Sequence, residues 1–85
     1  MIEKISVNVK ILPLNTEHNF LVPVKMSVKD ATELILQALH EEYPNVPQKS
    51  AAQTLLVVAS SGMALGASLS FEQLGIIQGE KLLLI

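Results

Sequence analysis

The chain has 85 residues, of which 49% are hydrophobic and only 4% aromatic, so it has room for one core of aliphatic side chains. Six Lys and no Arg stand against seven Glu and one Asp, and this balance argues against nucleic-acid binding, which needs clustered cations and stacking aromatics. Cysteine is absent, which excludes disulfides and cysteine–zinc sites and fits a reducing compartment.

Residues 4–26 predict a β-hairpin. Residues 4–11 alternate between polar and apolar side chains, which is the period of a strand with one buried face. Pro13 ends this strand, residues 14–18 form a polar turn, and a second alternation follows over residues 20–26. Pro23 lies on the outward side of the second strand. Because proline cannot donate to a sheet ladder, we expect this strand at an edge of the sheet.

An amphipathic helix is predicted to begin after Ser27 and to end near Tyr43, before Pro44. The segment SVKD resembles a capping box, with Ser27 as N-cap and the Asp30 carboxylate facing the first-turn amides. Apolar residues recur at spacings of three and four, which predicts one stripe that faces a sheet. The residues of this stripe are Val28, Ala31, Leu34, Ile35, Ala38 and Leu39.

Three further strands are predicted over residues 54–59, 63–65 and 81–85, with a turn at SSG between the first two. A second capping box, at residues 70–73, leaves room for about one helical turn before a glycine. The right-handed crossover rule favours placing the last strand beside the first and parallel to it, in the centre of the sheet. A central position explains why residues 81–85 are almost wholly aliphatic.

Residues 50–71 carry no charge, and 22 residues are about the length that spans a bilayer. Five Ser, one Thr, one Gln and two Gly interrupt this segment, and its apolar pieces have the length of strands. A hairpin is therefore favoured over a membrane span. The start of the chain alternates in polarity instead of forming the solid apolar run of an export signal.

The predicted order of elements resembles the ubiquitin-like β-grasp fold, as a single domain over residues 1–85. The resemblance is carried by the capped helix SVKDATELILQALH, the exit PNVPQ and the closing pattern LxxLGIxxGExLxL, read from Phe71 or Leu69 to Leu84. Within that fold, VPVKMSVKDATELILQAL and LGIIQGEKLLLI are most similar to the YukD/EsaB-type proteins that accompany bacterial type VII (WXG100/ESX) secretion systems. The resemblance implies an α+β fold in the order ββαββ, a short helical turn and a last strand, with one helix across one face of a mixed sheet.

Ubiquitin and its sulfur-carrier relatives act through a flexible tail closed by Gly-Gly, whereas this sequence stops at Leu84-Ile85. If these residues are the whole protein, the resemblance implies a module that is not conjugated to other proteins. Two alternatives stay open. The chain is a carboxylate-activated carrier truncated before its Gly-Gly, or it is the soluble domain of a larger membrane component of a secretion machine.

Residues for catalysis are scarce, and we predict no enzyme, no cofactor and no metal site. Asp30 is assigned to the helix cap, and no spacing typical of metal ligands involves His18 or His40. Both histidines are better interpreted as surface residues, His18 in the polar turn and His40 near the end of the helix. Ser60 and Ser61 fit an ordinary turn.

The candidate functional residues are apolar side chains that the core does not need. If Leu56 and Val58 face the helix, Leu55 and Val57 face outward. In the last strand the same alternation turns Leu83 and Ile85 outward. We therefore predict a protein-binding patch on the sheet face opposite the helix, in the position of the main recognition surface of ubiquitin. A slip of one residue in the third strand would exchange the two sets, and central strands also tolerate aliphatic residues on both faces without binding anything. The predicted patch consists of Leu55, Val57, Leu83 and Ile85.

The resemblance implies a protein partner, such as a membrane component of the secretion machine. It also implies a cytoplasmic location, and a membrane-bound partner would hold the chain at the cytosolic face of the membrane. A weak homodimer stays open. Nucleic acid and small-molecule substrates are not predicted.

Overall fold

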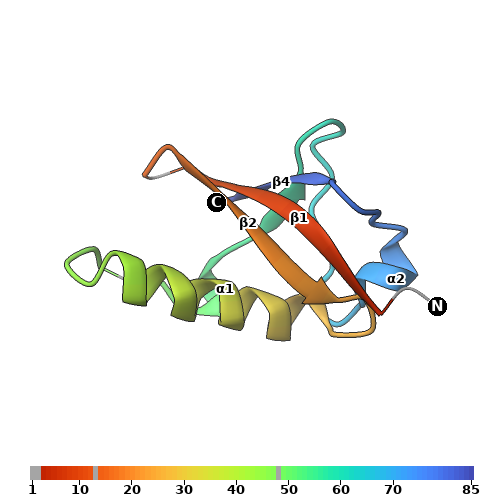
Figure 1. Cartoon of the computed structure of the whole chain (residues 1–85), viewed down its shortest axis with the longest axis horizontal. Helices are drawn as coiled ribbons and strands as arrows, with labels where there is room; N and C mark the ends of the chain where they lie inside the picture. Colours follow the sequence, from red (N-terminus) through yellow and green to blue (C-terminus); the bar gives the residue numbers. More distant parts are fainter. Residues whose placement is uncertain (1–2, 13, 48) are drawn as a thin grey trace.

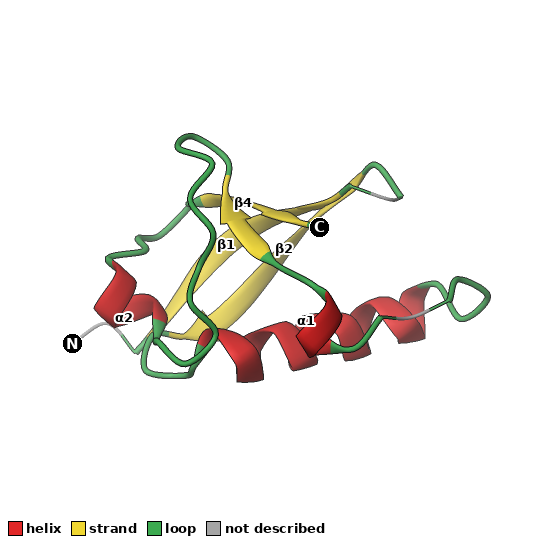
Figure 2. Cartoon of the chain, turned by 180° about the vertical axis from the view of Figure 1, so that it is seen from behind, coloured by secondary structure: helices red, strands yellow, loops and turns green. Residues whose placement is uncertain are grey.

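The computed structural model describes residues 3–12, 14–47 and 49–85, and in these residues four strands form one mixed sheet with the order β2-β1-β4-β3. One long helix, α1, crosses a single face of this sheet (Figures 1 and 2). The last strand lies in the interior of the sheet and runs parallel to the first, as predicted. The elements in chain order are β1 (Lys4–Ile11), β2 (Thr16–Pro23), α1 (Val28–Glu42), the 3₁₀ turn η1 (Ala51–Gln53), β3 (Leu56–Val58), α2 (Phe71–Leu74) and β4 (Lys81–Leu84).

Strands β1 and β2 form the predicted antiparallel hairpin, in a register that runs from Lys4 opposite Pro23 to Ile11 opposite Thr16. Strand β2 is at an edge, which confirms the prediction made from its proline. The predicted polar turn over residues 14–18 is too long, because β2 already begins at Thr16. Asn15 has a φ of 55°, a left-handed conformation that asparagine tolerates and that reverses the chain within fewer residues. The prediction that Pro13 ends the strand falls outside the described residues.

Helix α1 begins and ends where the sequence predicts. The Ser27 hydroxyl accepts a hydrogen bond from the backbone N–H of Asp30 at 3.1 Å, and the N–H of Tyr43 closes the last turn on Leu39 O at 2.7 Å. The predicted apolar stripe is partly wrong, because Leu34 and Ala38 are exposed and Thr32 is buried instead.

The buried position of Thr32 has a simple physical reason. Its hydroxyl donates to Val28 O at 2.7 Å, one turn earlier in the helix, so no polar group is left without a partner. The buried stripe of α1 is therefore rotated by about one position towards Thr32, away from Leu34 and Ala38.

Helix α2 carries Phe71, the one fully buried aromatic residue among the described residues, and places it in the core. Ser70 caps α2 with the predicted capping box, and Gly75 ends it in the left-handed conformation with a φ of 72°. The N–H of Val28 donates to Leu69 O at 2.8 Å, which ties the two helix starts together. The single core of the protein thus lies between α1, α2 and the inner face of the sheet.

The predicted strand at residues 63–65 is wrong in extent: the structure has only an isolated bridge between Val57 and Ala64. Two backbone bonds join this segment to β3, from Val58 N–H to Met63 O at 2.9 Å and from Leu65 N–H to Leu56 O at 2.8 Å. The chain then leaves the sheet and reaches the start of α1, where Ala67 O accepts a hydrogen bond from the N–H of Lys29 at 2.9 Å. Figure 2 shows this connection running from β3 down to α2.

The membrane-span alternative finds no support in the structure. None of the helices among residues 3–12, 14–47 and 49–85 is long and apolar enough to cross a bilayer. Much of the uncharged segment 50–71 belongs instead to η1, β3 and the connection that follows β3.

Candidate protein-binding surface

The sheet has an inner face that packs on α1 and an outer face that is opposite to it. On β4, Leu82 and Leu84 are buried in the core, so the residues between and after them face outward. On β3, Leu56 and Val58 likewise belong to the core, and Val57 does not. The alternation predicted for both strands is confirmed, and all four residues of the predicted patch follow the outward set.

Leu55 and Ile85 form the most exposed part of the predicted patch. They exchange two backbone hydrogen bonds, from Leu55 N–H to Ile85 O at 3.2 Å and from Ile85 N–H to Leu55 O at 2.9 Å. Residues that exchange both bonds in an antiparallel pair lie directly opposite each other, with their side chains on the same face. The two residues are 52% and 46% exposed. Their aliphatic side chains therefore present one continuous surface to solvent.

Val57 and Leu83 are also opposite each other in the β3–β4 ladder, but they contribute less to the surface. Leu83 is half-buried, and Val57 is only 8% exposed. The prediction that Val57 is available for binding is therefore wrong, although its direction is right. Val57 has Leu83 on one side and Ala64 on the other, so a short branched side chain is enclosed by its neighbours.

Leu12 is a residue of this surface that the sequence prediction missed. Its N–H donates to Leu84 O at 3.2 Å, and it follows Ile11, whose partner in the ladder is Leu84. This places Leu12 beside Ile85, and it is 41% exposed. The signal was present in the sequence, because Leu12 continues the outward set of the first strand by one residue. We call Leu12, Leu55 and Ile85 the end patch.

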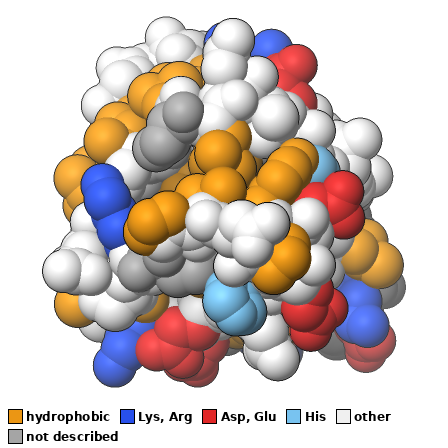
Figure 3. Space-filling view, turned by 90° about the vertical axis from the view of Figure 1, so that its left-hand side faces the viewer, with side chains coloured by type: hydrophobic (Ala, Val, Ile, Leu, Met, Phe, Trp, Pro, Cys, Tyr) orange, Lys and Arg blue, Asp and Glu red, His pale blue; other side chains and the backbone are white. Residues whose placement is uncertain are grey.

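The end patch continues into an open pocket of about 110 Å³ between the end of α1 and the end of the sheet. Figure 3 looks onto this end of the molecule and shows hydrophobic side chains gathered near its middle, with histidine and charged side chains around them. Ile85 belongs to both the end patch and the pocket wall. The pocket is lined by Ile11, Leu14, Leu36, Leu39, Val46, Pro47, Lys49, Thr54, Leu84 and Ile85.

The outer face over β1 and β2 is mostly polar, although Leu21 of β2 is 66% exposed there. Lys81 Nζ lies 3.1 Å from Glu17 Oε1, and both side chains are largely exposed. Between them Asn8 is the partner of Lys81 in the ladder, and its Nδ2 donates to Asn19 Oδ1 at 3.1 Å. An exposed ion pair adds only about 0–1 kcal/mol to stability, so this half of the face differs from the end patch mainly in its surface chemistry.

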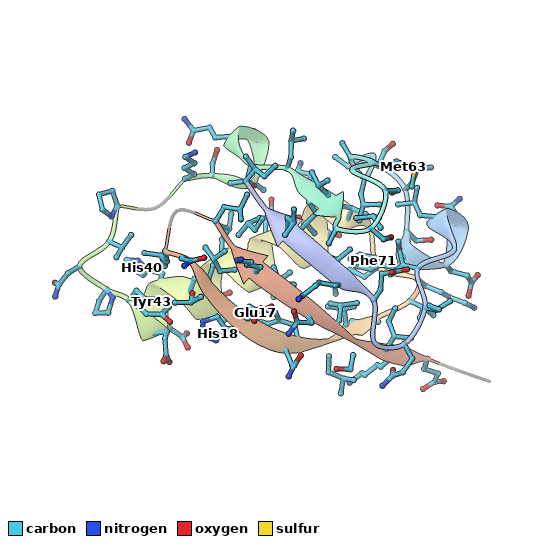
Figure 4. All side chains as sticks on the ribbon, turned by 90° about the horizontal axis from the view of Figure 1, so that it is seen from above. Glu17, His18, His40, Tyr43, Met63 and Phe71 are labelled. Carbon is cyan, nitrogen blue, oxygen red and sulfur yellow. The ribbon has the colours of Figure 1, made fainter. Side chains whose placement is uncertain are left out.

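The histidines do not converge on a reactive site. His18 is on β2 and not in a turn, because the strand begins earlier than predicted, and its side chain is partly buried. Its Nε2 lies 3.0 Å from the hydroxyl of Tyr43, which links the edge of the sheet to the end of α1 (Figure 4). His40 is exposed, as predicted. In the part of the chain that the structure describes, no three His, Asp or Glu side chains are grouped closely enough to hold a metal ion.

Comparison with known proteins identifies the fold. No family model and no curated protein sequence matches the chain. Solved structures do match: the EccD5 ubiquitin-like domain from Mycobacterium xenopi has a TM-score of 0.78 at 13% identity, over 99% of this chain and 94% of that chain.

Two further structures agree. An N-terminal ubiquitin-like domain, that of the 4931431F19Rik protein, has a TM-score of 0.76 at 21% identity, over 100% of this chain and 76% of that one. A chain of the MycP5-free ESX-5 inner membrane complex has a TM-score of 0.77 at 17% identity, over 99% of this chain and 21% of that one. The protein therefore has the ubiquitin-like β-grasp fold, as predicted from its sequence.

Proposed function

We propose that this protein is a non-conjugating interaction module that docks on another protein through the end patch. The observation that carries this proposal is the exposed, backbone-paired Leu55 and Ile85, which lie beside Leu12 and open into an apolar pocket. Exposed apolar surface of this kind on a small domain is often an interaction site. The rigid sheet holds the patch in place, so binding would cost little conformational entropy.

The setting that we propose is accessory or regulatory work at a bacterial type VII secretion machine, on its cytosolic side, in the manner of the YukD/EsaB-type proteins. Two of the structural matches support this setting, since one is an EccD5 domain and the other belongs to the ESX-5 inner membrane complex. The mechanism would be docking without covalent chemistry, and the partner would be a component of the machine.

A second candidate is that residues 1–85 are the ubiquitin-like domain of a larger membrane component. The match to the ESX-5 complex covers only 21% of that chain, so there the same fold is one part of a longer protein. In this case the end patch would dock within the same assembly, and the surface chemistry would be unchanged.

The test is affinity capture from the native cells, with quantitative mass spectrometry of the captured proteins. We expect the unmodified protein to capture secretion-machine components, and Leu55→Asp to reduce their recovery at least tenfold, because a carboxylate would be desolvated in an apolar contact. Ile77→Asp is the matched control, since it places the same charge on a side chain that is 66% exposed and not in the end patch.

Circular dichroism checks that both variants are folded. Equal recovery by the two variants would refute the end patch as the docking site. Recovery of the protein covalently attached to others, or bound to an adenylating enzyme, would instead support the truncated-carrier alternative.

A further inference from the structure

A different surface, the free edge of β2, has unpaired backbone groups. Val24 N–H donates to Glu3 O at 2.9 Å, so these two opposite residues form a hydrogen-bonded pair between β1 and β2. Because hydrogen-bonded pairs alternate along an antiparallel ladder, the backbone groups of Val22 and of every second residue before it also point to β1. The N–H and C=O groups of Glu17, Asn19 and Leu21 therefore point away from β1. Strand β2 is at the edge of the sheet, and none of the described residues pairs with it on that side. Such an edge is a template for another strand.

The free edge is bounded at both ends. Pro23 has no N–H, and its C=O already accepts the N–H of Met26 at 3.2 Å. At the other end, Asn15 is in the turn with its left-handed φ. Three alternate residues, Glu17, Asn19 and Leu21, are thus left between these limits, and they offer three N–H donors and three C=O acceptors.

The flank of α1 beneath this edge has two uncovered apolar residues, and the exposed Glu41 and Glu42 follow on the same flank one turn later. Lys29 and Thr32 border residues 51–56, so this flank of the helix faces η1 and β3. Leu34 and Ala38 are on the opposite flank of the helix, the flank towards β2, and Leu34 is 50% exposed. Figure 4 shows the C-terminal half of α1 lying near the β2 side of the sheet. Leu34 and Ala38, which were predicted to be buried but are exposed, therefore lie on the same side of the molecule as the free edge.

We propose that the free edge of β2 pairs with the same edge of a second copy of this chain, antiparallel, about a two-fold axis at Asn19. In this register Glu17 of each copy is opposite Leu21 of the other, and Asn19 is opposite Asn19. All three donors and acceptors of each edge are used, which gives six backbone hydrogen bonds between the copies. No two like charges are opposite each other. The proposal does not rest on the docking function of the end patch.

Neighbouring registers satisfy fewer groups, which is why the axis is placed at Asn19. An axis at Phe20 would bring Pro23 opposite Glu17, where the missing N–H removes bonds. An axis at His18 would bring the turn residue Asn15 opposite Leu21. The edge is thus most complementary to itself in one register, and this argues for a second copy as its occupant.

The same symmetry accounts for the uncovered helix flank. A two-fold axis perpendicular to the sheet keeps the helices of both copies on one side of the continuous sheet, with the Leu34 and Ala38 flanks turned towards each other. The contact is small by the standard of stable complexes, and the facing flanks both carry Glu41 and Glu42, so we expect a weak dimer with a Kd on the order of 100 µM.

The test is sedimentation velocity over a concentration series, with two substitutions at one position. Asn19→Ala removes the hydrogen bond from Asn8 but keeps the edge N–H, whereas Asn19→Pro removes both. We expect Asn19→Ala to dimerise like the unmodified chain and Asn19→Pro to stay monomeric. Leu34→Glu, at an exposed helix position, should raise the Kd at least tenfold because it adds like charges to a flank that already carries Glu41 and Glu42 in both copies.

Amide NMR spectra of the unmodified chain provide a test that needs no variant. On dilution from 1 mM, the shifts should change for residues 17–21 and for Leu34 and Ala38. A chain that is monomeric at 1 mM would overturn the proposal, as would shift changes confined to the end patch. It would also be overturned if Asn19→Pro, folded by circular dichroism, dimerised as well as Asn19→Ala.

Discussion

The inner and outer faces of the sheet are built from the same strands, but their side chains differ in burial and in polarity. On β4, Leu82 is fully buried against the helix, and the next residue, Leu83, is half-buried on the opposite face. The inner face is aliphatic on β1, β3 and β4 and makes up most of the core, whereas on β2 it also carries Phe20 and the partly buried His18. The outer face is divided into a polar half with the Glu17–Lys81 ion pair and an apolar end with Leu55 and Ile85.

This difference shows which face can determine the specificity for a binding partner. On β1, β3 and β4 every inner-face residue is enclosed by the same core, so its side chain is restricted to an aliphatic of the right volume. On the outer face a residue's environment depends on its neighbours on adjacent strands, and a polar and an apolar surface can exist a few residues apart. The inner face helps to build the ubiquitin-like fold that this chain shares with other structures, and a fold does not by itself determine which partner the outer face binds.

The largest effect that we expect comes from comparing Leu82→Ala with Leu83→Ala. Leu82 is 0% exposed, and its truncation should lower the free energy of unfolding by about 2–5 kcal/mol, because transfer energy is lost and a cavity is left. Leu83 is half-buried on the outer face, so its truncation should cost only about 1 kcal/mol. Urea denaturation followed by circular dichroism measures both values. Equal losses would mean that the side chains on the two faces of β4 are packed equally well.

A smaller effect is expected at the turn that determines which face each residue of β4 occupies. Gly79 has a φ of 84°, and its N–H donates to Ser6 O at 2.7 Å just before β4 begins. A side chain at this position would meet no atom within 4 Å, so the cost of Gly79→Ala is conformational only. We expect a loss of about 1–2 kcal/mol in the free energy of unfolding, again from urea denaturation.

Gly66→Ala is the matched control for that substitution, because Gly66 has no positive φ and an added Cβ would meet only the Leu69 side chain, at 3.4 Å. A Gly79→Ala chain as stable as the unmodified one would show that the turn is not under conformational restraint.

The sequence was sufficient to predict the inner face of β1 and β4, the edge position of β2 and the central position of the last strand. Period-two alternation identifies the buried side of β1, and the aliphatic run at residues 81–85 predicts a central strand. The capping residues Ser27 and Ser70 mark both helix starts correctly. These signals are local, or they follow from general rules of connection, so one sequence contains them.

The errors share one cause, which is that exposure depends on neighbours from distant parts of the chain. Val57 faces outward as predicted, but Leu83 and Ala64 on either side enclose it. Leu34 has the spacing of a core residue, yet the helix is rotated towards Thr32. Alternation gives the direction of a side chain, and only the packed structure shows what lies around it.

The smallest effect is expected in the polar half of the outer face. Glu17→Gln removes the ion pair with Lys81 and should lower the free energy of unfolding by about 0.2–1 kcal/mol, because both side chains are well exposed. A double-mutant cycle with Lys81→Gln isolates the pairwise energy, and 1 M salt should remove most of it, since screening then acts within about 3 Å. A coupling well above 1 kcal/mol that persists in salt would contradict this assignment.

The same Glu17→Gln chain also tests whether the outer face is divided in its function. If the end patch alone docks the partner, Glu17→Gln should capture secretion-machine components as well as the unmodified chain does, while Leu55→Asp should not. If capture is lost in both variants, the polar half contributes to the docking site, and the whole outer face acts as one surface. The partner would then need charged groups complementary to Glu17 and Lys81 beside its apolar contact, which is a stricter requirement than the end patch alone imposes.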